Sequence, residues 1–280
     1  MFHSVRKNAG HVHLFLGFIM KKIVAFAAAL VAGCSAFAID AVTVMTQAHD
    51  VEKPAFTMSK VKMDLIEKNG VLQESRVVTE YGREKDDLSS IVMIFNSPAS
   101  VKDTRFLMLE NGPGKDDDKF IYLPSLKTTR RIAASEGSKS FMGTDASYDD
   151  LSTREVDEDE HEMISEKEEK NGYMCWVVKS TPKDPKSSQY QYRINYIDQE
   201  TNYPVYTEMY DKKGKLWKTL TLEKLEKRSG ETGKTYDMPI QEYMKNVQTG
   251  HSTRLTIVQL KLDSEIPDRV FTSSFLNTGK

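Results

Sequence analysis

Hydrophobic and polar residues alternate with a period of two along most of the chain, which is the pattern of strands with one buried face. At residues 61–65, for example, Val61, Met63 and Leu65 alternate with lysines and an aspartate. Asn-Gly pairs at 69–70 and 171–172 are typical of type I′ hairpin turns. Similar units recur up to residue 262 and predict about eleven strands, joined mostly by direct hairpins.

One early segment has helical spacing instead. Apolar residues recur every three or four positions between Asp40 and Asp50, Asp40 suits an N-cap, and Pro54 ends the pattern. No helical pattern separates one strand from the next, so the sheet should be antiparallel. We therefore predict a mainly β fold: a single strongly curved antiparallel sheet that forms an incomplete barrel, its concave face covered by the helix and by the irregular stretch 133–151.

The sustained apolar run of the chain lies near its start, at 23–32, directly after Met20 and two lysines. A basic start followed by about ten apolar residues is typical of a signal peptide and is too short to span a bilayer. We expect residues 1–38 to be a leader, with Met20 as the natural start. Residues 39–280 should form a single exported domain, because no Pro/Gly/Ser-rich linker marks a second one.

Two overlapping cleavage sites imply different kinds of attachment. Cleavage after the small-x-small segment 36–38 would release a free periplasmic protein. The segment 31–34, Val-Ala-Gly-Cys, resembles a bacterial lipobox, in which Cys34 would be acylated and anchor the protein to a membrane. The second cysteine, Cys175, would then have no partner, so no internal disulfide is expected.

The charge balance argues against two classes of partner. The net charge is −2, and removing residues 1–33 leaves 35 basic residues against 41 acidic ones. No basic block of the kind that neutralises phosphates is present, which argues against nucleic acid. A mildly acidic surface also disfavours electrostatic adhesion to anionic lipid, so acyl chains or apolar surface should provide any membrane contact.

Sequence motifs of common enzymes are absent. There is no G-x-S-x-G segment, and the loop at 112–115 lacks the glycine and hydroxyl residues of a phosphate-binding loop. His49, His161 and His251 are isolated and lack metal-ligand spacing, so neither a metal nor a cofactor is predicted. We expect His161 to lie on a solvated charged face, His251 to serve a turn, and Cys175 to be a buried, inert thiol.

Soft apolar side chains are abundant, and 11 of the 13 methionines follow the leader. Methionine adapts its shape to irregular apolar partners, so a Met-rich and aromatic concave face suits acyl chains. An ordinary β core would account for the same composition. The candidate cavity residues are Val61, Met63, Leu65, Ile91, Met93, Phe95, Met108, Tyr122, Trp176 and Tyr192.

Two neighbouring motifs favour the cavity. Residues 120–132 read FIYLPSLKTTRRI and residues 140–151 read SFMGTDASYDDL. Together they resemble the signature of the LolA-like family of bacterial outer-membrane lipoprotein-sorting proteins, Y-L-P-x-L-x-x-x-R-R-I followed by F-M-G-(S/T)-D-x-S-Y-x-D-L. Further matches at 210–216, 250–253 and 267–272 extend the resemblance over nearly the whole mature chain.

The resemblance implies an incomplete β-barrel with helices across its mouth and a cavity for acyl chains. It implies a periplasmic carrier or outer-membrane receptor without catalysis, whose partners would be lipoprotein acyl chains, free lipid or fatty acid, and an inner-membrane transporter. Two alternatives stay open. One is a lipid-hydrolysing, phospholipase-like lipoprotein that uses the same cavity, and the other is an accessory scaffold of a lipid-exporting membrane pump.

The irregular stretch is expected to act as a lid, because long loops in compact domains are usually functional or disordered. Its apolar residues would dip into the mouth of the empty cavity and be displaced by an acyl chain. The lid residues are Phe141, Met142 and Tyr148. Ion pairs between a flanking arginine and an aspartate of the lid would clasp it shut. The clasp residues are Arg130, Arg131, Asp145 and Asp150.

Overall fold

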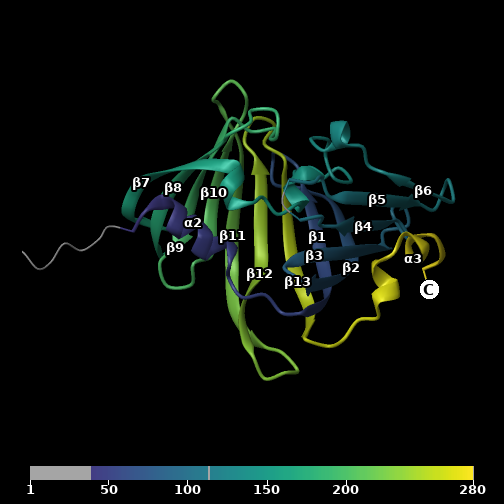
Figure 1. The fold of residues 1–280 in the computed structure, drawn as a ribbon. Coiled ribbons are helices and arrows are strands. Elements are labelled where there is room, and N and C mark those ends of the chain that lie inside the picture. Colours follow the sequence, from purple (N-terminus) through teal and green to yellow (C-terminus); the bar gives the residue numbers. More distant parts are fainter. Residues whose placement is uncertain (1–38, 113, 280) are drawn as a thin grey trace, which may run out of the picture. The chain divides into compact units, whose positions relative to one another are not determined.

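The structure is a computed structural model that describes residues 39–112 and 114–279 (Figure 1). The expected leader at 1–38 lies outside the described residues, together with both cleavage sites and Cys34. The leader, the lipid anchor and the position of cleavage therefore stay predictions.

Within the described residues, thirteen strands form one sheet in the order β6-β5-β4-β3-β2-β1-β13-β12-β11-β10-β9-β8-β7. Every neighbouring pair is antiparallel, and the edge strands β6 and β7 do not pair with each other, so the sheet is not closed into a barrel. The strands are β1 (Phe56–Ile66), β2 (Leu72–Lys85), β3 (Leu88–Ser97), β4 (Arg105–Leu109), β5 (Asp118–Leu123), β6 (Thr128–Arg131), β7 (Asp159–Lys170), β8 (Tyr173–Pro182), β9 (Tyr192–Asp198), β10 (Pro204–Tyr210), β11 (Leu216–Ser229), β12 (Thr235–Asn246) and β13 (Ser252–Leu262).

The mainly β, antiparallel class is confirmed, but the number of about eleven strands is too low. Short candidates such as β4, with five residues, and β6, with four, form strands of their own although they offer only two or three alternating positions. The expected helix is confirmed as α2 (Ala41–His49), which lies against β7 and β8. The Asp40 side chain accepts a hydrogen bond of 2.9 Å from the backbone N–H of Thr43 and so caps the helix.

The two Asn-Gly turns differ. Asn171 and Gly172 both have positive φ, 54° and 85°, as a type I′ hairpin between β7 and β8 requires. At 69–70 only Gly70 has a positive φ, and the β1–β2 ladder ends at the pair Ile66 and Leu72. The connection is therefore a longer loop, and the type I′ prediction for Asn69-Gly70 is wrong.

Both faces of the β1–β5 part of the sheet are covered. In β3, Met93 and Phe95 belong to one apolar cluster, while Val92 and Ile94, which alternate with them, belong to another. The first cluster includes Phe141 of the irregular stretch, and we call this side the inner face. The second cluster is completed by the C-terminal elements, and we call this side the outer face. The C-terminal elements are η4 (Asp268–Phe271) and α3 (Ser273–Thr278).

The irregular stretch, residues 133–151, covers the inner face without forming an α-helix, and we call it the cover segment. Its regular elements are the short turns η1 (Ala134–Glu136) and η2 (Asp149–Leu151), and the further turn η3 (Val156–Glu158) precedes β7. The Phe141 ring lies 5.0 Å from Phe106 and 5.6 Å from Tyr148, measured between centroids. Aromatic packing rather than helical structure therefore fixes the position of the segment. The expected helical cover is not seen.

Figure 1 shows the connection from β6 to β7 running across β13, β12 and β11. None of the helices in the described part of the chain is long and apolar enough to cross a membrane.

Covering of the outer face can be tested at Leu276, which is fully buried in α3. We predict that Leu276→Ala lowers the free energy of unfolding by about 2–4 kcal/mol, because it leaves a cavity between α3 and the sheet. Urea denaturation measures this change. Leu126→Ala is the matched control, since Leu126 is 66% exposed, and should change stability by less than about 0.5 kcal/mol. Equal effects of the two changes would mean that α3 does not pack on the sheet.

Candidate functional site

The sheet opens between β12 and β13. These strands pair only where residues 241–245 meet residues 252–256. Beyond that point, residues 235–240 pair with β11 alone and residues 257–262 pair with β1 alone. Pro239 lies in this stretch and has no N–H to offer a neighbouring strand. The result is a gap within a sheet that is otherwise paired from edge to edge.

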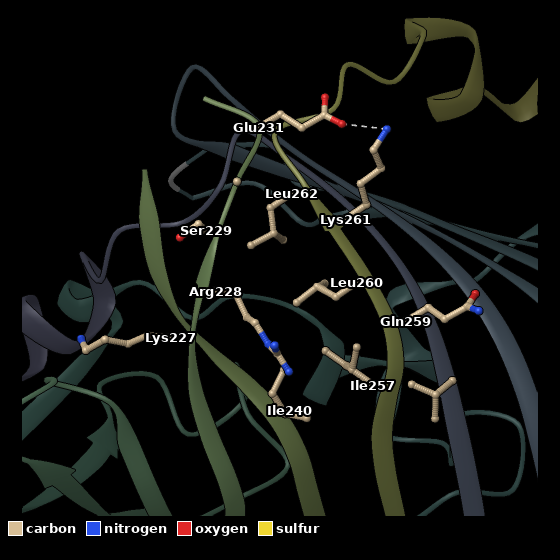
Figure 2. Close-up of a pocket in the computed structure, with 12 residues that line it drawn as sticks. Lys227, Arg228, Ser229, Glu231, Ile240, Ile257, Gln259, Leu260, Lys261 and Leu262 are labelled. Carbon is tan, nitrogen blue, oxygen red and sulfur yellow. Dashed lines mark ion pairs between the residues drawn. The ribbon is translucent and has the colours of Figure 1, made fainter. Parts of the chain in front are cut away.

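A cleft of about 570 Å³ occupies this gap, and we call it the β12–β13 cleft. Figure 2 shows apolar side chains from β12 and β13 lying on its walls, with polar side chains towards its rim. The apolar lining consists of Ile240, Ile257, Val258, Leu260 and Leu262. These five side chains form an apolar patch in a cleft whose exposed lining is otherwise mainly polar, so the cleft suits a ligand with an apolar part.

Basic residues on the rim of the cleft are already paired. Lys261 lies 2.8 Å from Glu231, and Lys227 lies 3.1 Å from Asp237. Arg228 is paired with Glu226. These pairs leave the rim without an excess of positive charge that would favour an anion.

Polar contacts join β12 and β13 again at the far end of the cleft. The Tyr236 hydroxyl donates to the Asp263 carboxylate at 3.0 Å, and the Thr232 hydroxyl donates to the same carboxylate at 2.7 Å. The backbone N–H of Glu231 donates to the carbonyl of Leu262 at 3.1 Å. The cleft is thus bounded at both ends and is a window in the sheet rather than a frayed edge.

Two carboxylates lie on the inner face beside the cleft. Glu242 is two residues from Ile240 on β12 and lies opposite Leu255 of β13. Glu80 lies opposite Ser59 of β1, which in turn lies opposite Leu260. Burial raises the pKa of each carboxyl to about 7, and the charge of Glu242 contributes to the shift of Glu80.

These groups have no polar partner among the described residues. Neither Glu80 nor Glu242 forms an ion pair or a hydrogen bond there. The hydroxyl of Ser59 is also without a partner, although Ser59 is only 3% exposed. A buried hydroxyl without a partner is costly, whereas Glu80 and Glu242 are only partly buried and keep some contact with solvent.

The cover segment is attached to β13 by a buried carboxylate. Asp145 accepts a hydrogen bond of 2.7 Å from the Thr253 hydroxyl, and its carboxylate lies 2.8 Å from His251 Nδ1. The backbone N–H of Asp145 also donates to Thr253 Oγ1 at 3.1 Å. Two sequence segments that carry the family resemblance, 140–151 and 250–253, therefore meet in space.

A second carboxylate attaches the cover segment to β11. Asp150 lies 3.0 Å from Lys218 Nζ, and both side chains are almost fully buried. The Tyr190 hydroxyl donates to Asp150 at 2.8 Å. Burial and the charge of Asp150 raise the pKa of Tyr190, which therefore stays a donor.

The predicted clasp between Arg130 or Arg131 and these aspartates is wrong. Arg130 pairs with Glu136 at 2.8 Å, and Arg131 pairs with Asp118. Both arginines lie on the edge strand β6, where acidic groups of adjoining segments are nearest. The aspartates of the cover segment reach across the sheet to β13 and β11 instead.

The predicted cavity residues divide into two groups. Seven lie on the inner face, where most of them are already packed beneath the cover segment. These are Val61, Met63, Leu65, Ile91, Met93, Phe95 and Met108. The lid residues Phe141, Met142 and Tyr148 pack against the same cluster.

The other three predicted cavity residues lie elsewhere. Tyr122 is on the outer face, with the Arg105 guanidinium 4.6 Å from its ring centroid. Tyr192 stacks on Tyr210 at 4.4 Å, and Trp176 lies in β8 opposite Ile197. The alternation in each strand indicates which residues share a face but not which of the two faces is the inner one.

Sequence reasoning missed the cleft and its carboxylates. The available signal was in β12, where an apolar stripe of alternate residues, Tyr236, Met238 and Ile240, continues into Glu242 and is interrupted by Pro239, which cannot donate to a neighbouring strand. Glutamate rarely occupies an inward position of an apolar stripe, so Glu242 was a sequence signal for an unusual site.

Two other residues can be compared with expectation. Cys175 is buried as predicted, and burial raises the pKa of its thiol to about 11, which makes it unreactive. His161 is not on a solvated face, because its ring nitrogens lie 2.9 Å from Ser180 Oγ and 2.8 Å from the carbonyl of Val156. Within the described residues, no group of three His, Cys, Asp or Glu could hold a metal ion.

His251 and Asp145 do not form part of a nucleophile-activating chain. His251 Nε2 lies 3.2 Å from Gln73 Oε1 rather than next to a hydroxyl or thiol. The Thr253 hydroxyl is committed to the Asp145 carboxylate. The arrangement attaches a segment and has no nucleophile–base contact.

A second cleft has a volume of about 550 Å³. Its residues include Gln241 and Arg254, which alternate along their strands with the inner-face residues Glu242 and Leu255. Arg254 forms two hydrogen bonds to Glu223, at 2.7 and 3.0 Å. Its apolar lining is limited to Tyr173 and Leu222, against five aliphatic residues in the β12–β13 cleft.

Comparison with known proteins places the chain in a family. Residues 87–278, more than half of the chain, match a family model whose description is "Uncharacterized protein". The chain belongs to this family. No curated protein matches it.

Solved structures with the same fold agree with the sequence resemblance. An outer membrane lipoprotein-sorting protein domain from Vibrio parahaemolyticus has a TM-score of 0.76 and 28% identity, over 85% of this chain and 98% of that one. A DUF1329 family protein from Desulfovibrio piger has a TM-score of 0.76 and 25% identity, over 84% and 97%. A LolA superfamily protein from Nitrosomonas europaea shares the fold, with a TM-score of 0.63 and 18% identity over 85% and 100%. The sequence resemblance to outer-membrane lipoprotein-sorting proteins therefore agrees with the similarity to the Vibrio parahaemolyticus domain, and the LolA superfamily protein shares the fold.

The two inner-face carboxylates should make the stability of this family member depend on pH. Their pKa is about 7 in the folded protein against a usual value of 4.5. The contribution of these two groups to the free energy of unfolding is therefore fully present below pH 4.5 and is lost as the pH rises through 7. We predict that replacing both, Glu80→Gln with Glu242→Gln, raises the free energy of unfolding at pH 8 by about 1–3 kcal/mol.

Urea denaturation at pH 5 and pH 8 measures this effect, and the double variant should lose most of the pH dependence. Glu231→Gln is the control, since a paired rim carboxylate whose pKa lies below its usual value cannot produce that dependence. A wild-type stability that is the same at both pH values would contradict the prediction.

Proposed function

We propose that this protein is an exported carrier or receptor that binds acyl chains of lipids or lipoproteins for transfer across the periplasm to the outer membrane. The observation that carries the proposal is the bounded β12–β13 cleft, with its patch of five apolar side chains, in an otherwise continuous sheet. In this proposal the protein acts by binding, without a catalytic step.

The physical requirement for such a carrier is large. An acyl chain that leaves a membrane exposes apolar surface at a cost of about 0.8 kcal/mol per CH₂ group. A cleft of about 570 Å³ with an apolar lining could remove much of one chain from water. The adjoining inner face, with the partly buried Met93 and Leu255, extends the same apolar surface.

The related structures support the proposal at the level of the superfamily. The Vibrio parahaemolyticus domain is described as a lipoprotein-sorting protein, and the Nitrosomonas europaea protein supports the fold. A periplasmic location and exchange of cargo with an inner-membrane transporter follow as parts of the proposal. Anchoring through Cys34 is a further part and depends on how the leader is processed.

The cover segment could enlarge the site by moving. It occupies the inner face through Phe141 and Tyr148 and is attached mainly by Asp145 and Asp150. Displacement of the segment would uncover soft apolar residues such as Met63 and Met108 beneath it. A ligand favours that state only if it binds it more tightly than the closed one.

Binding in the cleft can be tested with Leu260→Glu. A carboxylate on the apolar wall should weaken binding of a fluorescent fatty acid by at least about 10-fold, because the acyl chain would have to desolvate a charge. Leu126→Glu, at an exposed turn, is the matched control and should bind like the unaltered protein. Circular dichroism shows whether both variants are folded. Unchanged binding by a folded Leu260→Glu variant would place the acyl chain elsewhere.

Movement of the cover segment can be tested with Asp145→Ala. The change removes the bonds to Thr253 and His251, so the open state should gain population and apparent lipid affinity should rise several-fold. Hydrogen exchange across residues 133–148 should become faster. Exchange there that is as slow as in the strands, and unaltered by lipid or by Asp145→Ala, would mean that the segment is fixed structure.

A further inference from the structure

The connections between strands carry opposite charge at the two ends of the sheet. Antiparallel strands alternate in direction, so successive hairpin connections lie at opposite ends. Six of them lie at one end, which we call the basic end, and contain eight lysines and four carboxylates. They are residues 67–71, 98–104, 124–127, 183–191, 211–215 and 247–251. The five at the opposite end contain seven carboxylates and two lysines.

The small net charge therefore results from two ends of opposite sign. The net charge of the mature chain argued against electrostatic adhesion to anionic lipid, but it does not describe the basic end. An anionic surface would attract this end and repel the other, so it would also orient the protein.

Exposed apolar side chains lie at the basic end as well. Val71 and Leu72, where the first connection enters β2, are 59% and 52% exposed. Val247 and Leu126, in two further connections, are 38% and 66% exposed. Among the described residues, no large exposed apolar side chain lies in the connections of the opposite end. Aliphatic side chains and positive charge are thus combined at one end only.

Contacts join three connections of the basic end into one surface. The Gln248 amide donates to the Asp211 carboxylate at 2.9 Å, which links the β12–β13 and β10–β11 turns. The last pair of the β1–β13 ladder, Ile66 and Ser252, places the β1–β2 turn beside the β12–β13 turn. These three turns therefore meet a partner together.

The lysines of this surface are not neutralised by the protein. Lys68, Lys213 and Lys215 are exposed, and none of them forms an ion pair among the described residues. The Asp211 carboxylate accepts from the Gln248 side chain and from the backbone N–H groups of Lys213 and Lys215, so it stabilises the turn. Positive charge is therefore available to a partner.

The residue types favour a lipid surface over a protein surface. Protein interfaces are typically enriched in aromatic residues and arginine and depleted in lysine. The six connections of the basic end contain eight lysines and no arginine. A lysine is a flexible point charge, which suits an array of mobile phosphate groups better than a fixed planar partner.

We propose that the basic end docks on an anionic lipid bilayer, with the aliphatic side chains of its turns in the headgroup region and its lysines at the lipid phosphates. Apolar side chains gain free energy by leaving water, and lysines within a Debye length of an anionic surface are attracted to it. The inference goes beyond the proposed function, because it concerns the membrane and not the cargo. His251 of the β12–β13 turn contacts Asp145 of the cover segment, so docking would bring that attachment to the membrane.

Flotation with phospholipid vesicles tests the docking. The parent protein is the full chain with Cys34→Ser, which cannot be acylated at that position. One set of vesicles contains phosphatidylcholine alone, and the other contains equal parts of phosphatidylcholine and phosphatidylglycerol. The parent should bind the mixed vesicles at least about 10-fold more tightly, and this preference should fall as salt rises from about 0.05 to about 0.5 M.

The lysines are tested with a triple variant of the parent, which should lose at least about 10-fold in affinity for the mixed vesicles. It carries Lys68→Gln, Lys213→Gln and Lys215→Gln. The matched control removes the same charge at the opposite end and should bind like the parent. It carries Lys85→Gln, Lys115→Gln and Lys234→Gln, all at exposed positions. Equal losses would mean that net charge alone governs binding and would overturn the proposal.

The aliphatic side chains are tested with Val71→Ser combined with Leu72→Ser, which should lower affinity for the mixed vesicles at least about 5-fold. Ile164→Ser combined with Met174→Ser is the control, since these side chains of β7 and β8 are 50% and 38% exposed, and should bind like the parent. If only the lysine variant loses affinity, the contact is purely electrostatic, as with an acidic protein, and the bilayer assignment is overturned.

Docking and cargo binding can fail separately. Circular dichroism shows that each variant is folded, and all variants should bind a fluorescent fatty acid in solution like the parent. If the parent binds the fatty acid but not the mixed vesicles, docking is overturned and the acyl-chain proposal stands. If the parent docks as expected but binds no fatty acid, the proposed function fails and the docking inference stands.

Discussion

The interrupted ladder between β12 and β13 is the constraint on which the rest of the structure depends. An antiparallel sheet normally satisfies its backbone by pairing each strand with the next, and each hydrogen bond contributes about 0.5–1.5 kcal/mol. Here two central strands separate, and contacts of Thr232 and Tyr236 with Asp263 join them again at the far end. A gap that is closed at both ends and contains apolar side chains has the form of a binding site. Fraying would instead leave the ends of the two strands without contacts between them.

The two faces of the sheet are covered by different kinds of structure. The outer face of β1–β5 is covered by the C-terminal elements, whose Leu276 is fully buried. The inner face is covered by a segment without α-helical structure, held by Phe141 and by two aspartates that reach β13 and β11. A buried pair such as Asp150 and Lys218 contributes more to position than to net stability, since desolvation offsets much of the attraction. Such an attachment fixes where the segment lies while leaving it separable from the sheet.

Features that depend on local chemistry could be predicted from the sequence. The Asp40 cap of α2 and the turn at Asn171-Gly172 both follow from short-range preferences, and the inward stripe Val61, Met63 and Leu65 follows from period two. The sequence motif also identified the segment with Phe141 and Tyr148 as distinct from the strands.

Features that depend on which distant segments meet could not be predicted in the same way. His251 and Lys218, which lie against Asp145 and Asp150, are 106 and 68 residues away from them along the chain, and nothing local distinguishes Lys218 from the nearer Arg130. Tyr122 was assigned to the wrong face because period two leaves the absolute direction of a strand open. The cleft arises from a mismatch between two ladders, which becomes visible only when β12 and β13 are paired.

The central claim is that the opening in the sheet holds an acyl chain, and native mass spectrometry of protein purified from cells tests it most directly. The account predicts a mass above that of the mature chain, released on denaturation as a noncovalently bound acyl lipid, and lost when Leu260→Trp fills the cleft. Protein that carries no bound lipid under conditions that preserve such complexes, or a bound lipid that Leu260→Trp leaves in place, would contradict it.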